Sequence, residues 1–168
     1  AAAIPDFMAM GCNVLLIDQR ACGKSDGRYI CFGMKERYDV LSWVKWLNEN
    51  HGAQLPVYLD GVSLGGTTVL MASSLALPGN VAGIIADCGY TSPNEILKYI
   101  IKTYIHLPVF PTLPLISFIT KLVTGNYLTD ADTRECVKNT NIPIAFVHGA
   151  KDRFVPVYMG QENFEACR

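Results

Sequence analysis

The chain has 168 residues, of which 50% are apolar and 17% are charged. This apolar fraction excludes a disordered tail, and the length fits one globular domain or part of a larger one. The formal net charge of −1 argues against a nucleic-acid partner, so the composition favours a soluble, folded domain, and an enzyme in particular.

The six cysteines contain no C-x-x-C pair, and the three histidines lie far apart in the sequence. This pattern argues against a zinc site or a thioredoxin-like motif, so we expect neither a metal nor a cofactor. Reduced thiols that serve as small hydrophobic side chains are expected, which favours a cytoplasmic location. No signal peptide is expected, and the prolines at 108, 111 and 114 argue against a membrane span in the uncharged stretch between Lys102 and Lys121.

Four short apolar runs are typical of strands buried on both faces. They lie at 13–18, 57–60, 81–87 and 142–148. We expect these runs to form one parallel sheet.

Three segments between or after these runs predict helices. In 35–50 the apolar residues Val40, Trp43, Val44 and Leu47 recur at helical spacing. Further helices are expected over 66–77, which Pro78 and Gly79 terminate, and over 158–167. Strands that alternate with helices predict an α/β architecture, with a mostly parallel sheet flanked by helices.

The segment 91–140 breaks this alternation. About fifty residues separate two strands that one helix could connect, so we interpret 91–140 as an insertion within a single domain that spans 1–168. Helices are expected over 94–104 and 115–123. The proline-rich stretch between them predicts an irregular wall or lid.

The residues Gly61-Val62-Ser63-Leu64-Gly65 form a G-x-S-x-G motif between a predicted strand and a predicted helix. So sharp a turn favours glycine two positions before and two after Ser63. Ser63 is the predicted nucleophile, and the N–H of Leu64 at the helix start is a candidate oxyanion donor. The alternative is a serine that only caps the helix.

In this motif the sequence resembles the α/β-hydrolase superfamily, and two further motifs carry the resemblance. The loop from Asp18 to Gly27 is similar to the family's D-x-R-x-x-G-x-S-x-G, and His148 to Asp152 is similar to its H-G-x-x-D. The three motifs occur in the family's order and together cover nearly the whole chain. The resemblance implies a three-layer hydrolase fold with 91–140 as a helical lid, and it points to bacterial esterases and acyl-peptidase-like members.

The same resemblance implies that Asp152 is the acid of a catalytic triad. From the residues alone, Asp152 follows the last predicted strand and so lies at the same sheet edge as Ser63, where a carboxylate can orient a histidine. One alternative is a turn aspartate paired with Lys151 or Arg153. Another is that Asp87 is the acid, since some members of the family place it there.

A triad histidine is missing from the sequence. His51 lies at a helix end, His148 belongs to a turn, and His106 lies in the inserted segment. The resemblance implies a histidine one helix and one strand beyond the acid. It also implies an earlier strand between those at 13–18 and 57–60, followed by a loop with the second oxyanion donor. We therefore expect the chain to be the central portion of a larger hydrolase, incomplete at both ends.

Together these features predict a serine hydrolase, most similar to carboxylesterases, that cleaves a small or medium carboxylic ester through an acyl-enzyme on Ser63. Peptidase and thioesterase activities share this machinery. The alternative is a non-catalytic hydrolase-fold protein used for binding or assembly. The edge of an incomplete sheet also allows a homo-oligomer, and the apolar stretch 105–119 allows a lipid-facing role.

Overall fold

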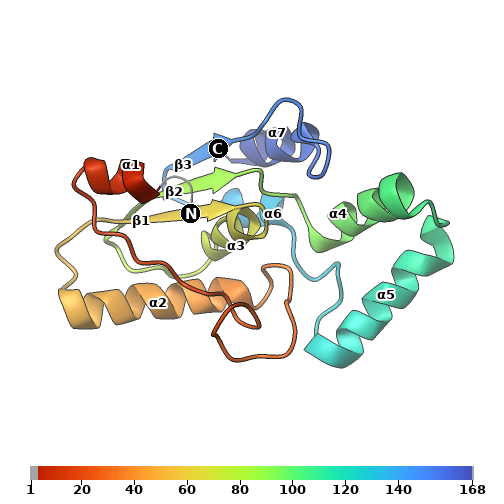
Figure 1. The fold of residues 1–168 in the computed structure, drawn as a ribbon, viewed down its shortest axis with the longest axis horizontal. Helices are drawn as coiled ribbons and strands as arrows, with labels where there is room; N and C mark the ends of the chain where they lie inside the picture. Colours follow the sequence, from red (N-terminus) through yellow and green to blue (C-terminus); the bar gives the residue numbers. More distant parts are fainter. Residues whose placement is uncertain (1–3, 168) are drawn as a thin grey trace.

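The computed structural model describes residues 4–167. Its centre is a parallel sheet in the order β1–β2–β3, formed by β1 (Val57–Val62), β2 (Val81–Asp87) and β3 (Ile144–Val147) (Figure 1). Around the sheet lie α1 (Ile4–Ala9), α2 (Glu36–His51), α3 (Leu64–Ala72), α4 (Pro93–Ile100), the π-helix η1 (Ile101–Ile105), α5 (Val109–Thr124), α6 (Thr133–Val137) and α7 (Val157–Ala166).

The helices α2, α3 and α7 confirm the three helices predicted along the chain. The helix α3 packs on β1 and β2, α7 packs on β3, and α2 packs on α3. The predicted helix over 66–77 instead starts at Leu64 and ends at Ala72. It ends early because the Ser73 hydroxyl donates to the carbonyl of Leu70 (2.7 Å) and the Ser74 hydroxyl donates to that of Met71 (2.9 Å), which favours a turn over further helix.

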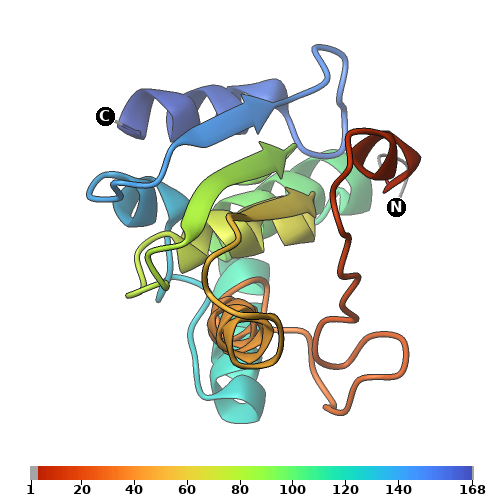
Figure 2. The same cartoon turned by 90° about the vertical axis from the view of Figure 1, so that its left-hand side faces the viewer.

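The prediction that the strands are buried on both faces is wrong for β1 and β3. On one face, Leu59, Ile144 and Phe146 pack against residues of α3, α6 and α7. On the other face, Tyr58 is 62% exposed and Val147 is 50% exposed. The described helices that pack on the sheet lie on the face that carries Leu59, Ile144 and Phe146. The helix α1 and the chain after it pass on the opposite face (Figure 2).

The apolar run 13–18 is not a strand, which corrects the prediction of a fourth strand. Leu15 and Leu16 are 44% and 66% exposed, and the run pairs with no strand of the described chain. A strand needs a hydrogen-bonded neighbour, and the hydrolase resemblance places a further strand between this run and β1. Within residues 4–167 no strand occupies that position, so the run remains extended and unpaired.

The segment 91–140 contains α4, η1, α5 and α6, and α4 and α5 lie beyond the carboxyl ends of the strands (Figure 1). The expectation of an irregular proline-rich stretch is wrong from Pro111 onward, where α5 is regularly helical. Phe110 has extended backbone angles, so the regular helix begins at Pro111. Pro111 and Pro114 therefore fall within its first four positions, where proline is tolerated best.

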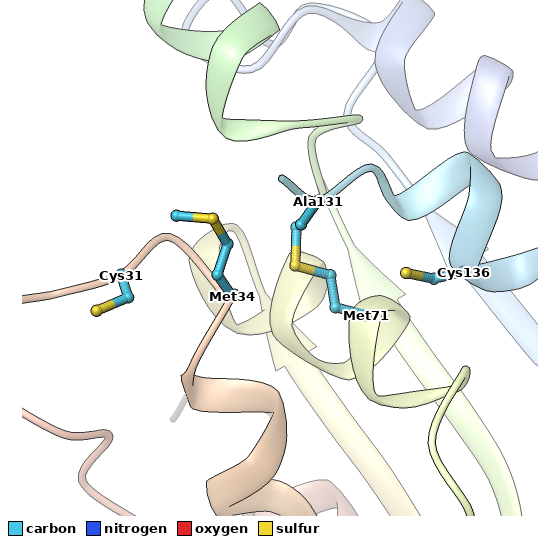
Figure 3. Close-up of a cluster of buried hydrophobic side chains, with 5 residues drawn as sticks. All are labelled: Cys31, Met34, Met71, Ala131 and Cys136. Carbon is cyan, nitrogen blue, oxygen red and sulfur yellow. The ribbon is translucent and has the colours of Figure 1, made fainter. Parts of the chain in front are cut away.

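A small apolar cluster joins α3 to the chain that precedes α2. Met71 of α3 clusters with Cys31 and Met34 from the chain before α2 and with Ala131 and Cys136 (Figure 3). The loop before α2 is also fixed by the carboxyl group of Glu36, which is 1% exposed. This carboxyl group accepts the N–H of Cys31 (2.6 Å) and the N–H of Gly33 (2.9 Å).

Replacing Glu36 with alanine is expected to lower the free energy of unfolding by about 2–4 kcal/mol, because two N–H groups would lose their buried acceptor. Chemical denaturation measures this change. The matched control is Glu49→Ala, an exposed residue of the same helix, for which we expect less than about 0.5 kcal/mol. Equal effects of the two substitutions would contradict the role given to the buried carboxylate.

All six cysteines lie in the described part of the chain, and all six are free thiols, as the sequence predicts. Among residues 4–167, no helix combines the length and the apolar character needed to cross a bilayer.

Candidate active site

The register of the sheet places the ends of its three strands side by side. Val62 pairs with Asp87, and Asp87 pairs with Val147. The next residue of each strand continues the pattern, since the N–H of Ser63 donates to the carbonyl of Asp87 (2.8 Å) and the N–H of Cys88 donates to that of Val147 (2.8 Å). The residues that follow β1, β2 and β3 therefore meet at one edge of the sheet.

Ser63 occupies the turn between β1 and α3 and is half-buried. Its φ of 55° and ψ of −114° are rare for a residue with a side chain, and such strain is frequent at functional positions. The side chain makes no capping hydrogen bond to α3, so the capping alternative is not supported. Leu64 is the first residue of α3, and its N–H has no carbonyl partner within the helix.

The close packing of this turn explains two of its glycines but not Gly65. A Cβ atom on Gly61 would overlap the carbonyl group of Gly65, and a Cβ atom on Gly66 would lie 2.7 Å from the carbonyl oxygen of Asp87. Apart from its chain neighbours and the nearby backbone of α3, a Cβ atom on Gly65 would meet no described atom within 4 Å. Among residues 4–167 no atom therefore requires glycine at position 65, and the expectation that a side chain there would clash is wrong. The second glycine that the turn requires is Gly66.

The substitution Gly61→Ala is expected to lower the free energy of unfolding by about 3 kcal/mol, the upper end for overpacking, because backbone atoms rather than a flexible side chain lie in the way. Gly65→Ala is the matched control, and we expect it to be neutral or stabilising because alanine favours a helix. Chemical denaturation of both variants measures the difference. A loss of stability in Gly65→Ala equal to that in Gly61→Ala would contradict this account of the turn.

Asp152 lies in the loop between β3 and α7, and its side chain is 24% exposed. Its Oδ1 accepts the N–H of Phe154 (2.8 Å) and the N–H of Val155 (3.0 Å). In the described chain, no ion pair joins Asp152 to Lys151 or Arg153, the partners of the alternative interpretation. One carboxylate oxygen thus holds the loop, while Oδ2 accepts neither of these N–H groups.

One apolar cluster connects the Ser63 turn with the Asp152 loop. Val155, which is 2% exposed, packs with Tyr90, Ile96 and Met159, and the side chain of Leu64 packs against the same cluster. The residues next to Ser63 and Asp152 therefore share one packed core. This core holds the two loops in a fixed relation.

Asp87 and Cys88 lie between these two loops, at the end of β2. Asp87 is half-buried and contacts the Ser63 turn through its backbone carbonyl. Burial raises the pKa of the Cys88 thiol, the nearby N–H of Ser63 lowers it, and the carboxylates of Asp87 and Asp152 raise it further. The net shift is upward, so Cys88 is a protonated thiol at neutral pH and a poor nucleophile beside Ser63.

None of the three histidines of the described chain bonds to both Ser63 and Asp152. His51 is exposed at the end of α2, and His106 is exposed after η1 with a left-handed φ of 58°. The Nε2 of His148 lies 3.9 Å from Oδ2 of Asp152, too far for a hydrogen bond, and instead bonds the carbonyl oxygen of Val155 at 2.9 Å. His148 therefore bonds a backbone group of the loop that follows β3.

The loop from Asp18 to Gly27 is held by its own polar groups. The carboxylate of Asp18 accepts the N–H of Lys24 (3.0 Å), and the hydroxyl of Ser25 donates to the carbonyl of Asp18 (2.7 Å). Arg20 pairs with Asp39 of α2. These contacts make the loop a structural support for α2.

Two cavities of the described chain lie away from Ser63. One, of about 520 Å³, lies between the loop 18–31, α2 and the end of α5. The other, of about 260 Å³, lies between the last two strands and α7 and is lined by His148. The side chain of Ser63 lines neither cavity.

Comparison with known proteins identifies the family to which this fold and its strand–turn–helix site belong. Residues 2–112 match the family model described as the alpha/beta hydrolase fold. The chain belongs to the α/β-hydrolase fold family, which confirms the predicted fold class, a parallel sheet flanked by helices. The match covers the motif around Ser63 and the loop from Asp18 to Gly27.

Individual relatives agree with this assignment. The uncharacterized protein YqkD of Bacillus subtilis (strain 168) is 27% identical over 162 residues, which are 96% of this chain and 53% of YqkD. The esterase Pf2001 of Pyrococcus furiosus is 25% identical with a TM-score of 0.66, over 89% of this chain and 54% of that chain. An acylaminoacyl peptidase of Pyrococcus horikoshii shares the fold with a TM-score of 0.54 at 16% identity, over 81% of this chain and 21% of that chain. The chain thus spans about half the length of YqkD and Pf2001.

Proposed function

We propose that the protein is a serine hydrolase of the carboxylesterase type, in which Ser63 is the nucleophile. The observation that carries this proposal is the strained backbone of Ser63 at the carboxyl edge of the sheet, between β1 and α3. This strand–turn–helix geometry holds a serine hydroxyl above the edge of a hydrolase sheet. The raised pKa of the neighbouring Cys88 thiol supports the serine over the cysteine.

In the proposed reaction, Ser63 Oγ attacks the carbonyl carbon of the ester, and its proton passes to a histidine base. The tetrahedral oxyanion accepts a hydrogen bond from the N–H of Leu64, which has no partner within α3. Collapse of this intermediate breaks the bond to the alkoxy oxygen, which leaves as the alcohol with the proton from the base. Water then attacks the acyl-enzyme, the base accepts its proton and returns one to Ser63, and the carboxylic acid is released.

Asp152 is the proposed acid that orients the base. One oxygen of its carboxylate is engaged with two loop N–H groups, which fixes the group and leaves the other oxygen to bond an imidazole N–H. The histidine is proposed to come from residues outside this chain, since His51, His106 and His148 make other contacts or face solvent. Asp87 is the alternative acid, at the end of the adjacent strand.

The segment 91–140 is the proposed lid, with its helices α4 and α5 beyond the carboxyl ends of the strands. Several of its apolar side chains are exposed, among them Phe110 (80%) and Phe118 (51%), and these suit an acyl group of small or medium length. The esterase Pf2001, one of the more similar solved structures, supports an ester as the substrate.

The test is turnover by the full natural protein that contains this chain, with p-nitrophenyl esters of two to eight carbons beside a matched p-nitroanilide and a thioester. We expect the esters to give the highest kcat/KM and a burst of p-nitrophenol equal to the enzyme concentration if deacylation is slow. Preference for the anilide would point to a peptidase. An absence of turnover on all three would favour the non-catalytic alternative, a binding protein on a hydrolase scaffold.

A further inference from the structure

Two tyrosines of the segment 91–140 bind the loop that carries Asp152. The hydroxyl of Tyr99 donates to the carbonyl oxygen of Arg153 (2.9 Å), and the hydroxyl of Tyr104 donates to the same oxygen (2.6 Å). The two rings contact each other edge to face with centroids 6.3 Å apart, and the ring of Tyr104 lies 6.0 Å from that of Phe154. A single peptide group next to Asp152 thus receives two hydrogen bonds from α4 and η1.

The π-helical turn η1 explains how two residues five positions apart reach one oxygen. In an α-helix of 3.6 residues per turn, residues five apart project about 140° away from each other. A π turn closes its hydrogen bonds between residues i and i+5, so residues at this spacing come to the same side. The α4 helix changes into η1 at Ile101, between Tyr99 and Tyr104, which is where the wider turn is needed.

The Asp152 loop has support on its other side as well. Val155 is buried in the apolar cluster, and its carbonyl oxygen bonds Nε2 of His148. Arg153 and Phe154, in contrast, are exposed. The exposed half of the loop is therefore held by the two tyrosine hydroxyls together with the two N–H groups that Asp152 itself accepts.

We infer that Tyr99 and Tyr104 are positioning residues that fix the carboxylate of Asp152 for catalysis, and that η1 brings their hydroxyls to the carbonyl of Arg153. This inference rests on the proposed function, because it takes Asp152 as the acid. It makes α4 and η1 part of the catalytic framework as well as part of the proposed lid. Because small displacements of a catalytic group cost large factors in rate, the contact acts on kcat.

The test is the double variant Tyr99→Phe/Tyr104→Phe of the full natural protein, which keeps both rings and removes both hydroxyls. We expect kcat to fall about 10- to 100-fold with little change in KM, because substrate contacts are retained while the acid loses its fixed position. The acidic limb of the pH profile of kcat/KM should move to lower pH, since a displaced carboxylate no longer raises the pKa of the histidine. A merely structural contact would not produce that shift.

Tyr127→Phe is the matched control, a tyrosine of the same segment that lies against Lys121 instead of the Asp152 loop. It should keep the wild-type kcat and pH profile. Suppose that the wild-type enzyme hydrolyses esters in a Ser63-dependent way and the double variant keeps the wild-type kcat and pH profile. This result would overturn the inference about the tyrosines and leave the proposed function in place. An absence of Ser63-dependent hydrolysis in the wild type would overturn the proposed function and this inference with it.

Discussion

Replacing Ser63 with alanine is expected to lower kcat for ester hydrolysis by at least about 10⁴-fold, because the variant has no oxygen with which to form the acyl-enzyme. The fold should be retained, since Ser63 holds the turn through its backbone. Its N–H donates to Asp87 and its carbonyl accepts the N–H of Thr67 (2.9 Å), while its side chain does not cap α3. Steady-state kinetics together with a thermal melt separate the loss of chemistry from a loss of structure.

Ser42→Ala is the matched control for this experiment. Ser42 is an exposed residue of α2 whose hydroxyl bonds the carbonyl of Tyr38 within the same helix. We expect its kcat to equal that of the wild type. A Ser63→Ala protein with more than a tenth of the wild-type kcat would show that another group, such as Cys88 at the end of the adjacent strand, is the nucleophile.

The substitution Asp152→Asn is expected to lower kcat by about 10³- to 10⁴-fold. Asparagine keeps an oxygen that accepts the N–H groups of Phe154 and Val155, so the loop conformation should persist. It lacks the negative charge that stabilises the imidazolium and the acceptor that fixes the histidine tautomer. The kcat of the variant, compared with its melting temperature, isolates this electrostatic role.

Asp87→Asn decides between the two candidate acids. Asp87 contacts the Ser63 turn through its backbone carbonyl, which the substitution leaves in place. We therefore expect its kcat to fall less than about 10-fold if Asp152 is the acid. A reversal, in which Asp87→Asn loses the larger factor, would assign the acid to the end of β2.

The sequence predicted the elements whose partners lie within the chain. The runs 57–60 and 81–87 become β1 and β2 because each has a hydrogen-bonded neighbour and a face buried against α3. The run 13–18 has the same apolar character but no neighbouring strand among the described residues. A local pattern shows that a segment suits a strand, while a partner decides whether the strand forms.

The candidate site was also predictable where it depends on the order of strands, and not where it depends on contacts between distant residues. The motif around Ser63 and the position of Asp152 follow from where strands end, because parallel strands bring their carboxyl ends to one edge. The need for Gly66 instead of Gly65 depends on the distance to the carbonyl of Asp87, which no spacing rule contains. The convergence of Tyr99 and Tyr104 on the carbonyl of Arg153 depends on a π turn whose residues look helical in sequence.

The buried carboxyl group of Glu36 is a further case of this kind. In the sequence it is one of several charged residues on an amphipathic helix, and its burial follows from the loop that folds over the start of α2. The two N–H groups of that loop, those of Cys31 and Gly33, explain why a carboxylate lies there. Tertiary contacts of this type leave no periodic signal.

The most direct test of the central claim, that Ser63 is an activated nucleophile, is intact-mass detection of a fluorophosphonate adduct on the full natural protein, followed by peptide mapping. We predict one adduct per chain, located on the peptide that contains Ser63 and absent from the Ser63→Ala variant. An adduct on another residue, or none at a reagent concentration that labels a known serine esterase to completion, would contradict the claim.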